Sequence, residues 1–187
     1  TEDIQEVIDF LKHGRNSMRD IVLFLLTVTL GLERSQLLEL TWNNFDNSFK
    51  YIVVQERKIE LCDVLQKYLT QLYKEKKKNR VKTPYVFQLH YNKQYKPMKE
   101  WNINDVFNNC AKITNDEKWK NYSPKYLRCC LIKTLFATGY SIEDIIYITG
   151  IDMKNLANLI DRDEIFERKN NRVSWKQLYD GILCESK

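Results

Sequence analysis

The stretch from Met18 to Gly31, MRDIVLFLLTVTLG, constrains the fold more than any other part of the chain. Apolar side chains occupy nearly every position between Ile21 and Leu30, so no face of a helix in this stretch would be polar. Such a helix has to be covered on all sides by other elements. A chain of 187 residues is long enough to supply that cover within one domain. The sequence therefore predicts a buried central helix that ends at Gly31.

Amphipathic segments surround this predicted helix in the sequence. Residues 1–12 carry apolar side chains at helical spacing, and Gly14 ends that pattern. Helices are also expected at 35–45 with Ser35 as the cap, at 63–80, at 102–114 with Asn102 or Asn104 as the cap, and over much of 123–184. Two runs of β character around Gln55 and Glu56 predict one small hairpin, and 83–89 reads as a short strand or extended entry. The fold class is mainly α with a small antiparallel β-sheet.

Charge and cysteine content set limits on function. The formal net charge is +5, which permits a nucleic-acid partner without requiring one. The five cysteines lack metal-ligand spacing, and His13 and His90 are isolated, so neither a metal nor another cofactor is expected. No apolar run of about 18 residues and no signal-peptide pattern occurs. We expect a protein with no membrane contact, located in the cytoplasm or another DNA-containing compartment.

Two boxes with fixed spacing resemble the catalytic domain of the tyrosine recombinases, the phage integrase family. GLERSQL, residues 31–37, is similar to the family's Gly-Leu-Arg-x-Ser-Glu-Leu box, and the predicted hairpin follows it. KYLR, residues 125–128, is similar to the family's His-x-x-Arg element. Gly139 and Gly150 follow Arg128 at successive intervals of eleven residues, as in the family. The resemblance covers essentially the whole chain and implies an integrase-type catalytic-domain fold over residues 1–187, without the family's N-terminal core-binding domain.

The resemblance also implies a chemistry that this sequence has lost in part. Family enzymes attack a DNA phosphodiester with a tyrosine, while two arginines hold the phosphate and a lysine and a histidine assist proton transfer. Here Glu33 stands in the first arginine slot, where a carboxylate repels phosphate. Ile151 replaces the histidine of the Leu-Gly-His element, and Ile160 stands in the tyrosine slot. Lys125 occupies the earlier histidine slot, while Arg128 keeps the second arginine. We expect Glu33 and Arg128 to pair across the old phosphate pocket, with Lys125 joining them.

Three functions remain open on this reading. The first is an integrase-like DNA-binding domain that has lost strand cleavage, a pseudo-enzyme that binds double-stranded DNA. Its candidate phosphate-binding residues are Arg128, Lys125, Arg34, Lys58, Lys76, Lys77 and Lys78. The second is a protein-interaction scaffold in a larger, possibly DNA-bound assembly. The third is an active recombinase with rearranged residues, acting in DNA recombination or integration.

The C-terminal segment adds one partner and one alternative nucleophile. In the family a terminal helix often docks on a neighbouring subunit, and residues 173–184 have an amphipathic pattern suited to a homo- or hetero-oligomer. Tyr179 lies in that segment and could act as a displaced nucleophile. Packing is the commoner role for a tyrosine at helical spacing with Leu178 and Ile182, so we expect no catalytic residue.

Overall fold

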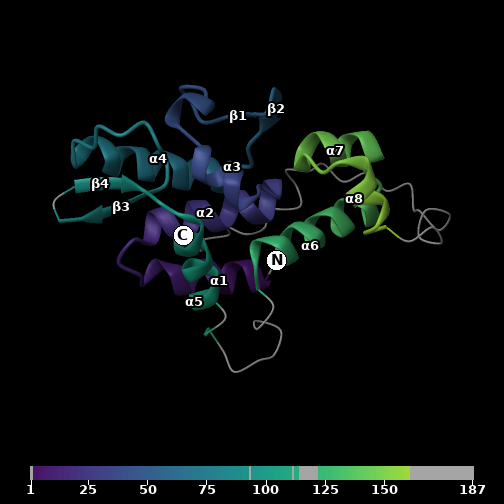
Figure 1. The fold of residues 1–187 in the computed structure, drawn as a ribbon, viewed down its shortest axis with the longest axis horizontal. Helices are drawn as coiled ribbons and strands as arrows, with labels where there is room; N and C mark the ends of the chain where they lie inside the picture. Colours follow the sequence, from purple (N-terminus) through teal and green to yellow (C-terminus); the bar gives the residue numbers. More distant parts are fainter. Residues whose placement is uncertain (1, 93, 111, 114–121, 161–187) are drawn as a thin grey trace, which may run out of the picture.

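The computed structural model describes residues 2–92, 94–110, 112–113 and 122–160. Its helices are α1 (Glu2–Lys12), α2 (Ser17–Leu30), α3 (Arg34–Glu39), α4 (Asp63–Lys78), α5 (Glu100–Cys110), α6 (Pro124–Ala137), α7 (Ile142–Thr149) and α8 (Met153–Ala157), with a 3₁₀ turn η1 (Trp42–Asn44). Its strands are β1 (Tyr51–Val54), β2 (Arg57–Glu60), β3 (Gln88–Tyr91) and β4 (Gln94–Pro97). The predicted class, mainly α with small antiparallel β structure, is confirmed (Figure 1).

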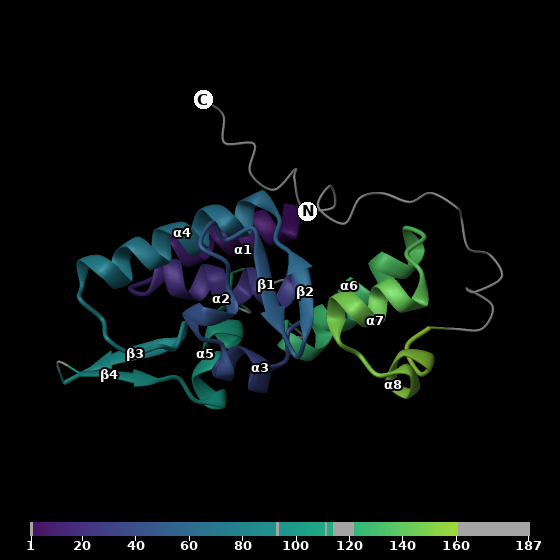
Figure 2. The same ribbon diagram turned by 90° about the horizontal axis from the view of Figure 1, so that it is seen from above.

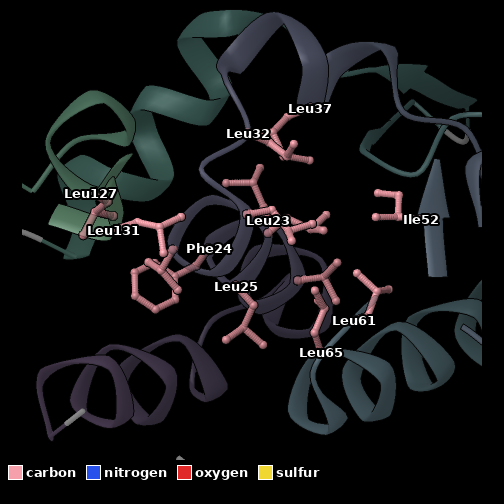
Figure 3. Close-up of a cluster of buried hydrophobic side chains, with 14 of the residues drawn as sticks. Leu23, Phe24, Leu25, Leu32, Leu37, Ile52, Leu61, Leu65, Leu127 and Leu131 are labelled. Atoms are coloured by element: carbon pink, nitrogen blue, oxygen red, sulfur yellow. The ribbon is translucent and has the colours of Figure 1, made fainter. Parts of the chain in front are cut away.

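Helix α2 is the centre of the fold, as the sequence predicts. Every residue from Ile21 to Leu30 is buried, and α1, α4 and α6 all pack against the helix. Figure 3 shows Leu23, Phe24 and Leu25 of α2 pointing into a cluster to which the neighbouring elements also contribute. The contributing side chains labelled there are Leu32, Leu37, Ile52, Leu61, Leu65, Leu127 and Leu131. The hydrophobic core is therefore packed around α2.

The predicted hairpin exists, and a second one accompanies it. Strands β1 and β2 pair antiparallel around Gln55 and Glu56, whose φ angles of 48° and 65° suit a tight hairpin turn. Strands β3 and β4 form a separate antiparallel pair at the other end of α4 from the first hairpin (Figure 2). The sequence indicated only a strand or extended entry over 83–89. Most side chains of the second hairpin are only partly covered or exposed, so it lacks the alternation that identifies a half-buried strand.

Two predicted helix caps are wrong. Helix α3 begins one residue before Ser35, and Glu33 is its N-cap. The backbone N–H of Glu33 donates to Gln36 Oε1 at 2.8 Å, because a glutamine at the third helical position reaches back to the cap. Helix α5 begins at Glu100, so Asn102 and Asn104, the two expected caps, both lie inside it, and Asn102 accepts a hydrogen bond from the Lys99 N–H at 2.9 Å. The first of these corrections places Glu33 at a helix entrance, which matters for the site.

Gly31 ends α2 in a conformation that favours glycine. Its φ is 64°, and its N–H donates to the Thr27 carbonyl at 3.0 Å. A Cβ at this position would lie 3.1 Å from Arg128 Cγ and 3.3 Å from Leu131 Cδ2. We expect Gly31→Ala to destabilise the fold by about 1–2 kcal/mol in urea unfolding, the cost of a left-handed residue other than glycine. Gly14→Ala is the control, because Gly14 is exposed and has no positive φ, and it should destabilise the fold less. Equal losses of stability in the two variants would contradict the role given to the left-handed backbone at Gly31.

Candidate functional site

A cavity of about 640 Å³ lies among α3, α5, α6 and α8. The start of α3, the first turns of α6 and the segment from Gly150 to Leu159 provide most of its walls. Residues predicted from the sequence to belong to one site line it together: Glu33, Arg34, Lys125, Arg128 and Ile151. Segments almost 100 residues apart in the sequence therefore meet where the two boxes predicted a common pocket.

An ion pair joins the two boxes inside this cavity. Arg128 Nη1 donates to Glu33 Oε1 at 2.5 Å. The Arg128 side chain is 11% exposed, whereas that of Glu33 is 59% exposed. The predicted pairing of Glu33 with Arg128 is confirmed. Lys125 is exposed, and within the described part of the chain no hydrogen bond or ion pair connects it to them, so the expected three-membered cluster does not form.

Local structure fixes both partners of the pair. Glu33 is held at the entrance of α3, two residues after the glycine that ends α2. Arg128 is on α6, whose N-cap Ser123 accepts a hydrogen bond from the Tyr126 N–H at 3.2 Å. The aliphatic stem of Arg128 passes close to Gly31, which leaves room for it because glycine has no side chain. The arginine is thereby directed across the gap towards Glu33.

Arg57 is a residue of this region that the sequence reading missed. Its Nη1 donates to the carbonyls of Tyr147 and Ile148, each at 3.1 Å, at the C-terminal end of α7. The guanidinium also lies against Gly150, where a Cβ would come within 2.6 Å of it. Burial lowers the pKa of Arg57, and the nearby positive charge of Arg128 lowers it further. A second arginine therefore lies beside the ion pair, but its Nη1 already donates to the carbonyls at the end of a helix.

A signal for Arg57 was present in the sequence. Period-two alternation along the predicted return strand places Arg57 on the same face as Ile59, which is buried, and places Lys58 on the opposite face. The sequence reading favoured Lys58, whose Nζ lies 4.5 Å from the centre of the Tyr51 ring and does not line the cavity. Tyr147 adds a second contact between the hairpin and α7, because its hydroxyl donates to the Lys58 carbonyl at 2.8 Å. The first hairpin is thus fastened to α7.

The charges lining the cavity balance. Glu33, Glu100 and Asp152 supply three carboxylates, and Arg34, Lys125 and Arg128 supply three cations. Arg34 Nη1 donates to Asn104 Oδ1 on α5 at 2.9 Å, so Arg34 is directed to α5. A pocket built to hold phosphate carries a surplus of positive charge. This one has no such surplus.

The two isoleucines that stand in catalytic slots are buried. Ile151 is 6% exposed and lines the cavity, and Ile160 is 7% exposed within the hydrophobic core. Neither side chain carries a group that transfers a proton or attacks phosphorus. Tyr179 and the segment 173–184 lie outside the described residues.

The remaining predicted cations lie away from the cavity. Lys76 Nζ is 5.5 Å from the centre of the Trp42 ring, and Lys77 Nζ is 4.6 Å from that of Tyr73. Both residues, with Lys78, belong to the last turn of α4. In the described ranges, no three His, Cys, Asp or Glu side chains are grouped as a metal site would require. None of the described helices is long and apolar enough to span a bilayer.

The ion pair predicts an asymmetry between its two members. We expect Glu33→Ala to lower the free energy of unfolding by about 1–2 kcal/mol, because it leaves the mostly buried Arg128 unpaired and beside Arg57. Arg128→Ala leaves only a carboxylate that is already largely exposed to water, and it removes a like charge from Arg57. Urea unfolding of both single variants and of the double variant measures the difference. A larger loss for Arg128→Ala would contradict this account.

Comparison with known proteins places the chain in a family. The sequence profile of the phage integrase family matches residues 1–163, so the chain belongs to the phage integrase family. No curated protein sequence matches it.

Solved structures with the same fold share little sequence with this chain. XerA recombinase has a TM-score of 0.71 and 15% identity, over 89% of this chain and 61% of that one. A segment of the Tn1549 transposon integrase, in complex with circular intermediate DNA, has a TM-score of 0.61 and 17% identity, over 86% of this chain and 60% of that one. A variant of that integrase, bound to a second circular intermediate DNA, has a TM-score of 0.61 and 18% identity. The chain therefore spans about three fifths of these proteins, and the likeness concerns the fold.

Proposed function

We propose that this chain is an integrase-type domain that binds double-stranded DNA and does not cut it. The observation that carries the proposal is the ion pair between Glu33 and Arg128. The one arginine kept from the family pair donates to a protein carboxylate placed where the other arginine would be. The match over residues 1–163 supports treating residues 1–187 as a single domain of this type.

Cleavage needs charge stabilisation that this cavity does not offer. The transition state of phosphoryl transfer gathers negative charge on oxygens that preorganised cations have to hold. Glu33 is 59% exposed, so water screens the roughly 4 kcal/mol that an unscreened charge pair at about 4 Å would be worth, but a carboxylate in place of an arginine still changes attraction of the phosphate into repulsion. The buried Ile151 and Ile160 supply neither a proton donor nor a nucleophile. A pseudo-enzyme fits these residues better than an enzyme.

DNA binding needs less than cleavage does. Contacts from Lys and Arg to the phosphate backbone provide affinity without any nucleophile. Lys125 is exposed at the cavity, and Lys58 and the end of α4 carry further cations. Two of the similar structures are integrases in complex with circular intermediate DNA. These observations support double-stranded DNA as the partner. The segment 173–184 stays a proposed contact to a second subunit because of its amphipathic sequence pattern.

A salt series with a mixed-sequence duplex tests this proposal. We expect the affinity to fall steeply as salt rises, with a slope proportional to the number of phosphates contacted. Because Glu33 already engages Arg128, Arg128→Ala should change the affinity less than Lys125→Ala, which removes an exposed cation. Absence of binding at low salt would reject the proposal. A covalent protein–DNA adduct on a nicked duplex would instead establish an active recombinase with rearranged residues.

A protein-interaction scaffold is the second candidate, and the balanced charge of the cavity favours it. A neutral cleft attracts a polyanion less strongly than a basic one does. Trp101, 58% exposed on α5, adds apolar surface near the cavity wall that Glu100 forms. Absence of DNA binding together with assembly on a protein partner in size-exclusion chromatography would support this role.

A further inference from the structure

Two arginine side chains from distant elements lie over two neighbouring glycines. The stem of Arg128 passes close to Gly31, and the guanidinium of Arg57 lies against Gly150. A Cβ at Gly31 would also lie 3.7 Å from the Cβ of Thr149, the residue before Gly150, so the two glycines are close together. Strand β2, which begins with Arg57, lies next to α7 (Figure 2). Arg57 is therefore placed behind the part of the cavity wall that Gly150 forms, close to Arg128.

The charge of this group of side chains is positive. Burial lowers the pKa of Arg57, and repulsion from Arg128 lowers it further. Among the described residues, Glu33 is the one carboxylate that pairs with either arginine. Two positive charges against one negative charge leave a net charge of one positive unit. Arg57 does not line the cavity, so its charge adds to the balanced set of lining charges from behind the wall.

Hydrogen bonds hold Arg57 in its place near Arg128. Its Nη1 donates to the carbonyls of Tyr147 and Ile148, each at 3.1 Å. The Tyr147 hydroxyl accepts from the Lys58 N–H at 3.1 Å and donates to the Lys58 carbonyl at 2.8 Å, so β2 itself is attached to α7. Movement of Arg57 away from Arg128 would break these contacts. The repulsion between the two arginines is therefore built into the fold.

Glu33 is the member of the group that can move. Its side chain is 59% exposed, whereas that of Arg128 is 11% exposed. The Glu33 N–H donates to Gln36 Oε1 at 2.8 Å, so the start of α3 keeps this bond when the carboxylate turns to solvent. An exposed carboxylate regains water when it leaves an arginine, and the net loss is small. The slot beside Arg128 can therefore change its occupant while both positive charges stay.

We propose that Arg57 is a positioning residue that keeps the slot beside Arg128 a site for a tetrahedral oxyanion, and that Glu33 is its displaceable occupant. Arg128 contacts the oxyanion, and Arg57 acts through Arg128 and through its charge behind Gly150. A planar guanidinium suits the oxygens of a phosphodiester. The backbone of duplex DNA is the ligand, an assignment that rests on the function proposed above. The Glu33 carboxylate then competes with the DNA backbone for one guanidinium.

Titration of the whole chain with sulfate, followed by calorimetry, tests the slot without DNA. Glu33→Gln keeps the length of the side chain and removes its charge. We expect it to bind sulfate about tenfold more tightly than the unaltered chain, the value of one charge-assisted hydrogen bond. Glu39→Gln is the matched control, because Glu39 is exposed on α3 and does not line the cavity. Equal sulfate affinities in the two variants would overturn the proposal.

A second variant at the same position guards against a folding defect in Glu33→Gln. Glu33→Asp keeps the charge and places a favoured N-cap residue at the start of α3. Its side chain is one methylene shorter, so its carboxylate reaches Arg128 less well. We expect a sulfate affinity between those of the unaltered chain and Glu33→Gln. An affinity equal to that of the unaltered chain would count against a displaceable carboxylate.

The role of Arg57 is tested in the Glu33→Gln background. Arg57→Gln should weaken sulfate binding by about fivefold, and Arg57→Lys should retain most of the affinity, because the effect depends on charge. Tyr147→Phe is the structural control, since it removes the hydroxyl that attaches β2 to α7 and leaves every charge in place. Unchanged affinity in Arg57→Gln, or an equal loss in Tyr147→Phe, would overturn the role given to Arg57.

A mixed-sequence duplex, titrated with the same variants at constant ionic strength, separates this proposal from the proposed function. We expect Glu33→Gln to bind the duplex more tightly than Glu39→Gln does, and sulfate to weaken that binding more than chloride does. Duplex binding that is equal in the two variants would overturn the proposal and leave the proposed function standing. Sulfate binding in the expected pattern without any duplex binding would reject DNA as the ligand, and the proposed function with it.

Discussion

Replacing Glu33 by arginine is expected to tighten binding of the domain to duplex DNA by about tenfold or more at low salt. The change frees Arg128 from its carboxylate and adds a second cation where the family has an arginine. The full charge-pair energy of roughly 4 kcal/mol does not apply, because Glu33 is 59% exposed and water screens it. An effect of about 1.4 kcal/mol, or tenfold, remains. The salt slope should also become steeper, since more phosphate charge is neutralised.

The same substitution should weaken the unliganded fold. Arginine at position 33 would lie close to Arg128 and Arg57, and three guanidinium groups without an anion repel one another. We therefore expect a lower melting temperature that added sulfate restores more than it does in the unaltered chain. Glu39→Arg is the control, because it makes the same charge change at an exposed position of α3 that does not line the cavity. Equal gains in DNA affinity for both variants would show that net charge alone, and not the cavity, is responsible.

The ion pair was predictable because family spacing fixed the position of each residue. The two boxes place Glu33 and Arg128 in slots that face each other across one pocket, and the charge reversal then decides how they interact. The central helix was predictable for a different reason, since a stretch that is apolar on all sides and too short to span a bilayer has to be covered by other elements. Both inferences rest on residues whose position is fixed by a pattern.

The missed features depend on contacts between segments far apart in the sequence. The position of the Arg57 side chain depends on α7, because its Nη1 donates to the carbonyls of Tyr147 and Ile148, some 90 residues later in the sequence. The Asn102 cap was wrong because a helix start depends on which residue adopts an extended backbone, and polar residues suitable as caps stand close together here.

Phe24→Ala should have the largest effect on stability of the substitutions considered, about 3–5 kcal/mol in urea unfolding. Phe24 is fully buried on α2, and its ring lies 6.3 Å from those of both Phe107 and Tyr122. Figure 3 shows it beside Leu127 and Leu131 of α6, the helix that carries Arg128. Truncation would leave a void at the junction of α2 with α5 and α6, and close packing on three sides limits how far the neighbours can collapse into it.

Phe10→Ala is the control for this substitution. Phe10 is 38% exposed on α1, so its truncation should lower the free energy of unfolding much less. The comparison also tests how the site is supported. If α2 positions α6, a destabilised Phe24→Ala variant should lose part of the coupling energy between Glu33 and Arg128 in a double-mutant cycle, since the arginine's helix would be held less firmly. An unchanged coupling energy would mean that Gly31 and the two helix caps fix the ion pair without help from the core.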